Sequence, residues 1–280
     1  MIIVSTVTDL HAALALFRAN GKTIGFVPTM GALHDGHLSL VNQSKLETDV
    51  TCVSIFVNPK QFGPSEDFDR YPRTVEADCA LLKTAGVELV FSPKVSDIYP
   101  DTDVVSLSHY DLPEMAEWYC GKTRPQFFKG VCEVVQRLFA FVTPDRAFFG
   151  EKDYQQLTII SDMARTLSLP IRVVGCPILR EPSGLAMSSR NRYLSSDDQV
   201  EATTIYRSFM ETRRAWMNGI SDTTVLLDTF FSHLSIHIAP DYCVIVDPLT
   251  LVPQPVVRVN DRMLFAGTLR STRLIDNIAF

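Results

Sequence analysis

The stretch VPTMGALHDGHLSL (Val27–Leu40) joins a short apolar run to a segment with helical spacing. Residues 22–27 before it are β-rich and apolar, and after it leucine and valine recur at near-helical intervals through Leu46. The stretch is therefore predicted to contain the end of a strand, a tight turn and the start of a helix.

Two histidines lie at this predicted helix start. His34 and His37 are three residues apart, which on a helix places both side chains on one face. Helix N-termini favour anions because their N–H groups are unpaired and carry partial positive charge. Gly31 and Gly36 let the backbone approach a ligand closely. Either histidine alone is more simply an ordinary partly buried residue, but the combination favours a phosphate site.

Apolar runs and helical patterns alternate through the first part of the chain. This alternation predicts an α/β fold with a doubly wound, Rossmann-like parallel sheet. Ligands of such sheets bind beyond the carboxyl ends of the strands, where residues 28–37, 58–61 and 150–156 fall. Further strands are predicted at 50–59, 88–93, 146–150 and 171–179, and helices at 74–87, 127–142 and 155–169.

The alternation stops at REPSG (180–184), which we interpret as a domain boundary. Residues 1–179 are predicted to form the larger domain and residues 180–280 a smaller α+β domain. Two helical stretches (197–217 and 222–235) and two β-rich runs (242–246 and 263–266) support the second domain.

Composition limits the function classes. The 280 residues are 46% hydrophobic and 21% charged, as in ordinary globular proteins, and the formal net charge is −6. That charge argues against a broad nucleic-acid or anionic-membrane surface. The six cysteines are scattered without a C-x-x-C pair, and the first twenty residues match neither a signal peptide nor a membrane span. We therefore expect a cytoplasmic protein with reduced thiols.

Two later segments carry phosphate-binding side chains. In GEKDYQQL (150–157), Lys152 follows a predicted strand and can place an ammonium group on a phosphate chain, while Asp153 suits a ribose hydroxyl or Mg²⁺. In MSSRN (187–191), two hydroxyls and a guanidinium suit a polyphosphate. The alternatives are a solvated helix start and a polar loop before the helix capped near Ser195.

A third segment, FVNPKQF (56–62), ends a predicted strand with two amides. Asn58 and Gln61 can bind a small polyol or carboxylate without changing its charge. The alternative is that Asn-Pro only marks a turn and Gln61 faces solvent.

Together these segments resemble the pantoate–β-alanine ligase (pantothenate synthetase) family over essentially the whole chain. Five blocks occur in order and at suitable spacing, whereas the first alone would indicate only the wider nucleotidyltransferase superfamily with its His-x-x-His phosphate site. The blocks are PTMGALHDGH (28–37), FVNPKQF (56–62), FFGEKDYQQL (148–157), MSSRN (187–191) and TRLIDN (272–277).

The resemblance implies a two-domain, typically homodimeric enzyme. ATP and Mg²⁺ would activate pantoate as pantoyl adenylate with release of pyrophosphate, and β-alanine would then displace AMP to give pantothenate. Residues 1–179 would bind the nucleotide and pantoate, and residues 180–280 would form a lid.

The resemblance also implies site residues. His37, His34 and Lys152 would be catalytic, Gln61 and Gln156 would bind pantoate and β-alanine, and Asp78 is a weaker candidate for a metal ligand. The ATP-binding residues would be Met30, Gly31, Ala32, Leu33, His34, Asp35, Gly36, His37, Gly150, Glu151, Lys152, Asp153, Leu179 (through its backbone, at adenine), Met187, Ser188, Ser189 and Arg190.

One block departs from the family pattern. Relatives usually carry Arg-Pro-Gly-His-Phe-Arg-Gly-Val where this chain has RPQFFKGV (124–131). Phe127 replaces the histidine, so no role of that histidine is carried over and Phe127 is left out of the predicted site.

Two other functions compete with the ligase. A plain nucleotidyltransferase acting on another substrate would share the histidines, and a nucleotide-sensing binding module would keep the fold without turnover. Lys152 and the MSSRN block argue against the sensing module.

Overall fold

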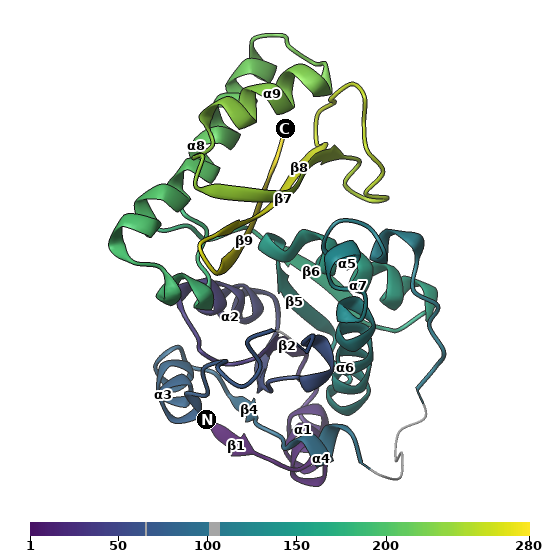
Figure 1. The fold of residues 1–280 in the computed structure, drawn as a ribbon. Coiled ribbons are helices and arrows are strands. Elements are labelled where there is room, and N and C mark those ends of the chain that lie inside the picture. Colours follow the sequence, from purple (N-terminus) through teal and green to yellow (C-terminus); the bar gives the residue numbers. More distant parts are fainter. Residues whose placement is uncertain (65, 101–106) are drawn as a thin grey trace.

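The computed structural model describes residues 1–64, 66–100 and 107–280. Its larger sheet has six strands in the order β1–β4–β3–β2–β5–β6 (Figure 1), and each neighbouring pair runs parallel. The predicted doubly wound α/β architecture is confirmed. The strands are β1 (Ile2–Val4), β2 (Ile24–Thr29), β3 (Val50–Ile55), β4 (Leu89–Phe91), β5 (Arg146–Gly150) and β6 (Arg172–Cys176).

Helices cover both faces of this sheet because successive strand residues point to opposite sides. Phe26 joins a core with side chains of α1, α6 and α7, whereas its neighbour Val27 joins a core with α2 and α3. The helices of this part are α1 (Val7–Ala19), α2 (Asp35–Glu47), α3 (Val75–Thr84), α4 (Val95–Ile98), α5 (Cys120–Thr123), α6 (Phe127–Val142) and α7 (Tyr154–Thr166), with short 3₁₀ turns η1 (Pro59–Gln61), η2 (Glu114–Ala116) and η3 (Glu151–Asp153).

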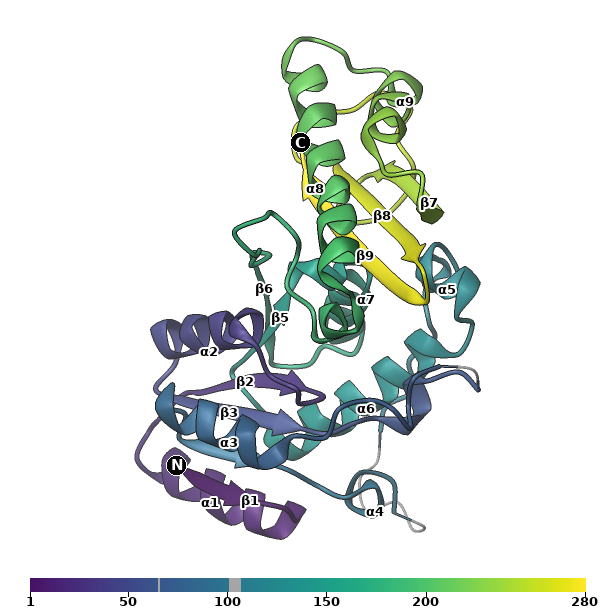
Figure 2. The same cartoon turned by 60° about the vertical axis from the view of Figure 1, so that its left-hand side comes forward.

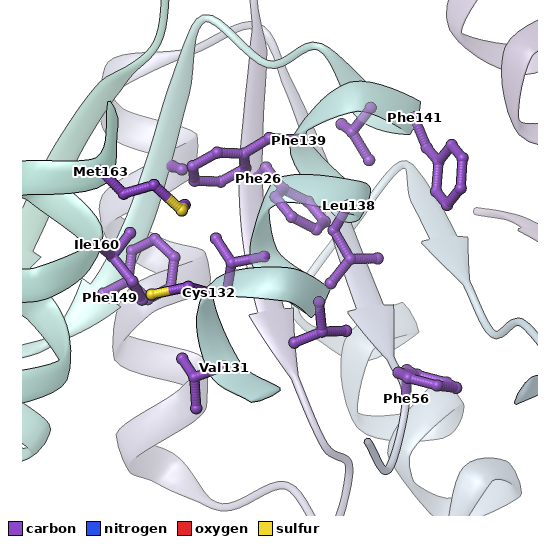
Figure 3. Close-up of a cluster of buried hydrophobic side chains, with 14 of the residues drawn as sticks. Phe26, Phe56, Val131, Cys132, Leu138, Phe139, Phe141, Phe149, Ile160 and Met163 are labelled. Carbon is purple, nitrogen blue, oxygen red and sulfur yellow. The ribbon is translucent and has the colours of Figure 1, made fainter. Parts of the chain in front are cut away.

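Aromatic rings connect helix α6 to the sheet in the larger core (Figure 3). Phe139 of α6 packs edge-on against Phe26 of β2 and Phe149 of β5, with ring centroids 6.5 and 6.3 Å apart. Such edge-to-face pairs stabilise a core beyond their buried area. Helix α6 is thereby fixed against the two strands that border the candidate site.

The strand order reverses between β2 and β5. Helix α2, which follows β2, packs on one face, and α7, which follows β5, packs on the other. The chain leaves these adjacent strands in opposite directions, which opens a crevice at their carboxyl ends. The loop that follows β2 and the turn η3 that follows β5 begin at this crevice.

The rest of the chain forms a second layered unit (Figure 2). Its antiparallel sheet has the order β7–β8–β9, and α8 lies along β8 and β9. Leu251 and Leu264 also join the larger core, so the two units pack together. We propose that the first domain ends at residue 179 and the second begins at residue 180. The elements are η4 (Ser189–Tyr193), α8 (Ser196–Met217), α9 (Thr223–His233), β7 (Ile238–Val246), β8 (Arg262–Leu269) and β9 (Thr272–Ala279).

The structure changes several predicted boundaries. The strand expected at 50–59 ends at Ile55, and the Asn58 side chain instead caps η1 by accepting from the Lys60 N–H. The strand expected at 171–179 ends at Cys176. Sequence patterns did not predict β1, α1 or β9. Strand β1 has only three residues, and polar residues inside β9 conceal its alternation.

Two expectations from composition concern the cysteines and membrane-spanning helices. All six cysteines are described and each is a free thiol. Within residues 1–64, 66–100 and 107–280, no helix combines the length and apolar character needed to cross a membrane.

We expect Phe139→Ala to lower the free energy of unfolding by about 3–5 kcal/mol, because Phe139 is 2% exposed and its removal leaves a cavity between α6 and the sheet. Urea unfolding followed by circular dichroism measures the loss. Leu46→Ala, at a residue 81% exposed, is the control and should change stability by about 0.5 kcal/mol or less. Equal losses in the two variants would contradict the packing described.

Candidate functional site

Asp78 of α3 holds the loop between β2 and α2. Its carboxylate accepts the Ala32 and Leu33 N–H groups at 3.0 and 2.9 Å and the Thr74 hydroxyl at 3.1 Å. Gly31 has φ +79°, and a Cβ there would lie 2.9 Å from an Asp78 oxygen, so glycine is required on both counts. Asp78 therefore pins the loop that leads to the two histidines.

His34 and His37 form a capping box at the start of α2. His34 is the N-cap, and its Nδ1 accepts the Gly36 N–H at 3.1 Å. His37 Nδ1 accepts the His34 N–H at 3.4 Å, and the two rings lie 4.2 Å apart. Because both Nδ1 atoms accept, each neutral ring carries its proton on Nε2. The pair thus presents two Nε2–H donors.

Burial and nearby positive charge keep both histidines neutral. Burial, followed by the charge of Lys152, lowers the pKa of His34 to about 4, with Asp35 partly opposing the shift. Burial, followed by His34 and Lys152, lowers the pKa of His37 to about 3. The imidazoles supply hydrogen bonds at neutral pH, while positive charge comes from other residues.

Lys152 supplies one such charge from η3, directly after β5. Its side chain is 20% exposed, and Nζ lies 3.5 Å from the Asp153 carboxylate. The carbonyl oxygens of Glu151 and Lys152 accept hydrogen bonds from the Asn277 side chain of β9. A residue far away in the sequence therefore holds the backbone of this turn.

Arg190 of the MSSRN segment is partly engaged. Its Nε and Nη2 donate to the two Asp67 oxygens at 3.1 and 2.9 Å. Ser188 caps η4 by accepting the Arg190 N–H, and the Ser189 hydroxyl lies 3.4 Å from that of Tyr71. Within the described residues, Arg190 Nη1 has no partner, so it remains available to an anion.

Two glutamines lie near these groups, and their side-chain amides differ in how they are hydrogen-bonded. Gln61 is held in place, because its Oε1 accepts from Asn58 and its Nε2 lies 3.1 Å from the Met30 sulfur. The Gln156 amide makes no hydrogen bond within the described part of the chain. Apolar side chains of α6 and β5 lie beside them, including Val134, Val135, Leu138 and Phe149.

One cleft of about 710 Å³ joins most of these groups, and His34 is not among its lining residues. The predicted residues that line it are Met30, His37, Lys152, Asp153, Ser188, Arg190, Gln61 and Gln156. Ala32 and Leu33, like Gly31, are buried within the loop between β2 and α2. Leu179 is exposed, and its carbonyl accepts the Met187 N–H at 3.0 Å, which ties it to the MSSRN segment.

Sequence reasoning missed part of the cleft wall. Phe127, left out of the predicted site, lines the cleft, and its ring packs 3.6 Å from the Arg124 guanidinium. Arg124 also donates to both Glu66 oxygens at 2.6 Å and to the Gln61 carbonyl at 3.2 Å. The departure from the family pattern at 124–131 was the signal, but it did not indicate which wall the ring would join.

The described residues contain no group of three or more His, Cys, Asp or Glu side chains arranged to hold a metal ion. Asp78 is 2% exposed and its oxygens are engaged by the loop, so its expected metal role stays a prediction. Asp153 borders the cleft. Mg²⁺ that arrives with a nucleotide needs only one or two carboxylates besides phosphates and water, which one such side chain fits.

The chain matches known proteins along its length. The pantoate-beta-alanine ligase family model matches residues 2–279. A pantothenate synthetase of Sulfurihydrogenibium sp. (strain YO3AOP1) is 43% identical over 283 aligned positions, covering 100% of both chains. One from Pseudomonas putida (strain W619) is 45% identical, covering 98% of this chain and 96% of the relative.

Solved structures agree with the sequence comparisons. A pantothenate synthetase of Thermus thermophilus superimposes with a TM-score of 0.93 at 43% identity, covering 99% of each chain. A pantoate-beta-alanine ligase of Francisella tularensis, solved in complex with beta-gamma ATP and beta-alanine, gives a TM-score of 0.79 at 33% identity, covering 100% of this chain and 97% of that one.

We expect the wild-type protein to lose stability faster than a His34→Asn/His37→Gln variant as pH falls from 6.5 towards 4. Both folded-state pKa values lie below 6.5, so the unfolded chain binds protons first in this window and acid favours unfolding. The slope differs by up to about 1.4 kcal/mol per pH unit for each fully titrating histidine.

The double variant is a suitable reference because asparagine at the N-cap and glutamine at N3 preserve a capping box. Urea unfolding at pH 7.5, 6.5 and 5.5 measures the two slopes. Identical pH dependence in the two proteins would contradict the lowered pKa values.

Proposed function

The chain belongs to the pantoate–β-alanine ligase family, and we propose that it carries out this family's reaction in the cleft between its two sheets. It is an ATP-dependent, AMP-forming ligase that condenses (R)-pantoate with β-alanine through pantoyl adenylate to give pantothenate, AMP and pyrophosphate. The observation that carries the proposal is one cleft with His37, Lys152 and Arg190 beside two glutamines and an apolar wall.

The proposed ATP subsite follows the carboxyl ends of β2 and β5. The Nε2–H groups of His34 and His37 would donate to phosphate oxygens, and Lys152 would supply positive charge. Arg190 would add its free Nη1 donors from the second unit. Backbone groups of 30–33 and 150–153, together with Leu179 and 187–189, would hold the rest of the nucleotide, as the family resemblance indicates.

Pantoate would bind beside these groups. Its branched four-carbon skeleton carries two methyl groups that suit the apolar wall formed by α6 and β5, and its hydroxyls and carboxylate need hydrogen bonds. Gln61 and Gln156 supply neutral amides there. An arginine would bind the carboxylate more strongly, but it would stabilise the ground state and occupy the lone pairs that must attack.

In the first step, a pantoate carboxylate oxygen attacks the α-phosphorus, and the bond to the bridging oxygen breaks as pyrophosphate leaves. This chemistry needs alignment and charge neutralisation and little covalent help from protein. The neutral histidines would supply hydrogen-bond donors for this step, and Lys152 and Arg190 would supply positive charge. Holding both reactants in line contributes about 7–11 kcal/mol.

In the second step, the unprotonated amine of β-alanine attacks the acyl carbon of pantoyl adenylate. The bond from that carbon to the AMP oxygen breaks, AMP leaves, and the amide nitrogen gives up a proton. Gln61 borders the part of the cleft that Arg124 and Phe127 enclose, and we propose that β-alanine enters there.

Mg²⁺ would reach the cleft with ATP. Asp153, which borders the cleft, would contribute a ligand, and Asp78 remains the weaker candidate. When bound, the ion would neutralise phosphate charge. We further propose a homodimer in the cytoplasm, supported by the family resemblance and by six free thiols, with no nucleic-acid partner, in keeping with the net charge of −6.

Incubation with ATP, Mg²⁺, pantoate and β-alanine tests the proposed function. We expect AMP release to require both small substrates and to match pantothenate formation. A nucleotidyltransferase acting on another substrate would form no amide, and a nucleotide-sensing module would bind ATP without turnover. AMP release independent of pantoate or β-alanine would overturn the ligase assignment.

We expect Gln156→Glu to abolish most pantoate binding and adenylation while ATP affinity, measured by calorimetry without pantoate, stays near wild type. The change is nearly isosteric but sets a carboxylate against the substrate carboxylate. Like charges ~4 Å apart cost roughly 4 kcal/mol at an effective dielectric of 20.

Gln136→Glu is the matched control for this variant. It makes the same chemical change on α6, where the Gln136 amide donates to the Ser108 carbonyl outside the cleft. We expect normal adenylation there. Normal turnover by Gln156→Glu, or an equal loss of ATP binding, would remove Gln156 from the pantoate subsite.

A further inference from the structure

A buried amide of the second sheet holds the turn that carries Lys152. Asn277 of β9 is 2% exposed. Its Nδ2 donates to the carbonyl oxygens of Glu151 at 2.8 Å and Lys152 at 3.0 Å. Both N–H bonds of the amide are therefore used on consecutive residues of η3, more than a hundred positions earlier in the chain.

Charged neighbours fix the orientation of this amide. Arg262 donates from Nη1 to Asn277 Oδ1 at 2.6 Å and from Nη2 to the Glu151 carboxylate at 3.1 Å. A guanidinium only donates, so the amide oxygen must face Arg262 and the amide nitrogen must face the carbonyls. The buried Asp276, paired with Arg180, also accepts the Asn277 backbone N–H.

Local capping does not fix η3. Gly150, the residue that precedes it, provides no side-chain cap, and Asp153 makes no capping hydrogen bond to α7. The turn has three residues, and 3₁₀ hydrogen bonds have poorer geometry than those of an α-helix. Its geometry consequently depends on partners from elsewhere, and the Asn277 amide binds the carbonyl of Lys152 itself.

We propose that Asn277 is a positioning residue for Lys152, and through it for the adenylation step. By binding two successive carbonyls it fixes the backbone from which the Lys152 side chain extends into the cleft. Asn277 belongs to the second sheet, so the position of that sheet also determines the position of the phosphate-binding ammonium. This inference rests on the proposed role of Lys152.

Asn277→Asp tests the inference selectively. The substitution retains an oxygen for Arg262 but replaces the two donors with an oxygen that repels the Glu151 and Lys152 carbonyls. Pantoate-dependent exchange of pyrophosphate into ATP measures adenylation alone. We expect a roughly ten- to hundredfold loss, since small displacements of a catalytic group have effects of this size. Conversion of preformed pantoyl adenylate by β-alanine should change far less.

Asn277→Ala separates the loss of donors from the added negative charge. It introduces no charge, and we expect the same selective loss of exchange activity. Should Asn277→Asp fail to fold, this variant carries the test, with Arg262 then free to keep its contact to Glu151.

A double-mutant cycle with Lys152→Ala distinguishes positioning from general stability. If Asn277 acts through Lys152, Asn277→Asp should lower the exchange rate by about twofold or less in a Lys152→Ala background. A difference of that size is no larger than the usual deviation from additivity, so it counts as no further effect. Leu269→Ala, in the core of the second unit, is the control. It should lower the melting temperature and leave the exchange rate of the folded enzyme unchanged.

Each contrary result has a separate meaning. Full exchange activity in Asn277→Asp, with Lys152→Ala defective, overturns the inference and leaves the proposed function intact. Equal losses with and without Lys152, or in both half-reactions, also overturn it, because the role would then be structural. Normal exchange by Lys152→Ala overturns the proposed role of Lys152 together with the inference.

Discussion

The reversal of strand order between β2 and β5 is the constraint on which the site depends. Parallel neighbours whose following helices pack on opposite faces leave their carboxyl ends uncovered. Everything that meets ATP in our proposal begins there, since the histidines follow β2 and Lys152 follows β5. The aromatic contacts of Phe139 with Phe26 and Phe149 hold α6 against these two strands, so core packing and site geometry are joined.

The cleft combines neutral hydrogen-bond donors with side chains that carry a fixed positive charge. In our proposal His34 and His37 serve both the fold and the site, because their Nδ1 atoms cap α2 while their Nε2–H groups have no partner within the described residues. Lowered pKa values keep them uncharged. This arrangement leaves the positive charge to Lys152 and Arg190, so in our proposal adenylation depends on where those two cations are held.

Partners that are distant in sequence position those cations. Asp67 orients Arg190 across the cleft, and Asn277 holds the backbone of Lys152. Asp78 likewise holds the backbone of the loop before the histidines. Buried polar groups that are fully hydrogen-bonded specify one arrangement, because any alternative leaves donors or acceptors unpaired.

Sequence by itself determined the α/β class, the strand–turn–helix at Val27–Leu40 and helix α6, because hydrophobic periodicity is local. Motif blocks also indicated the family and the residues proposed for the site. Only tertiary structure decided the strand order, the tautomers of the histidines and the contacts of Phe127 and Asn277. These depend on groups brought together from separate elements, and no spacing along the chain encodes the burial or the hydrogen-bond partner that each one meets.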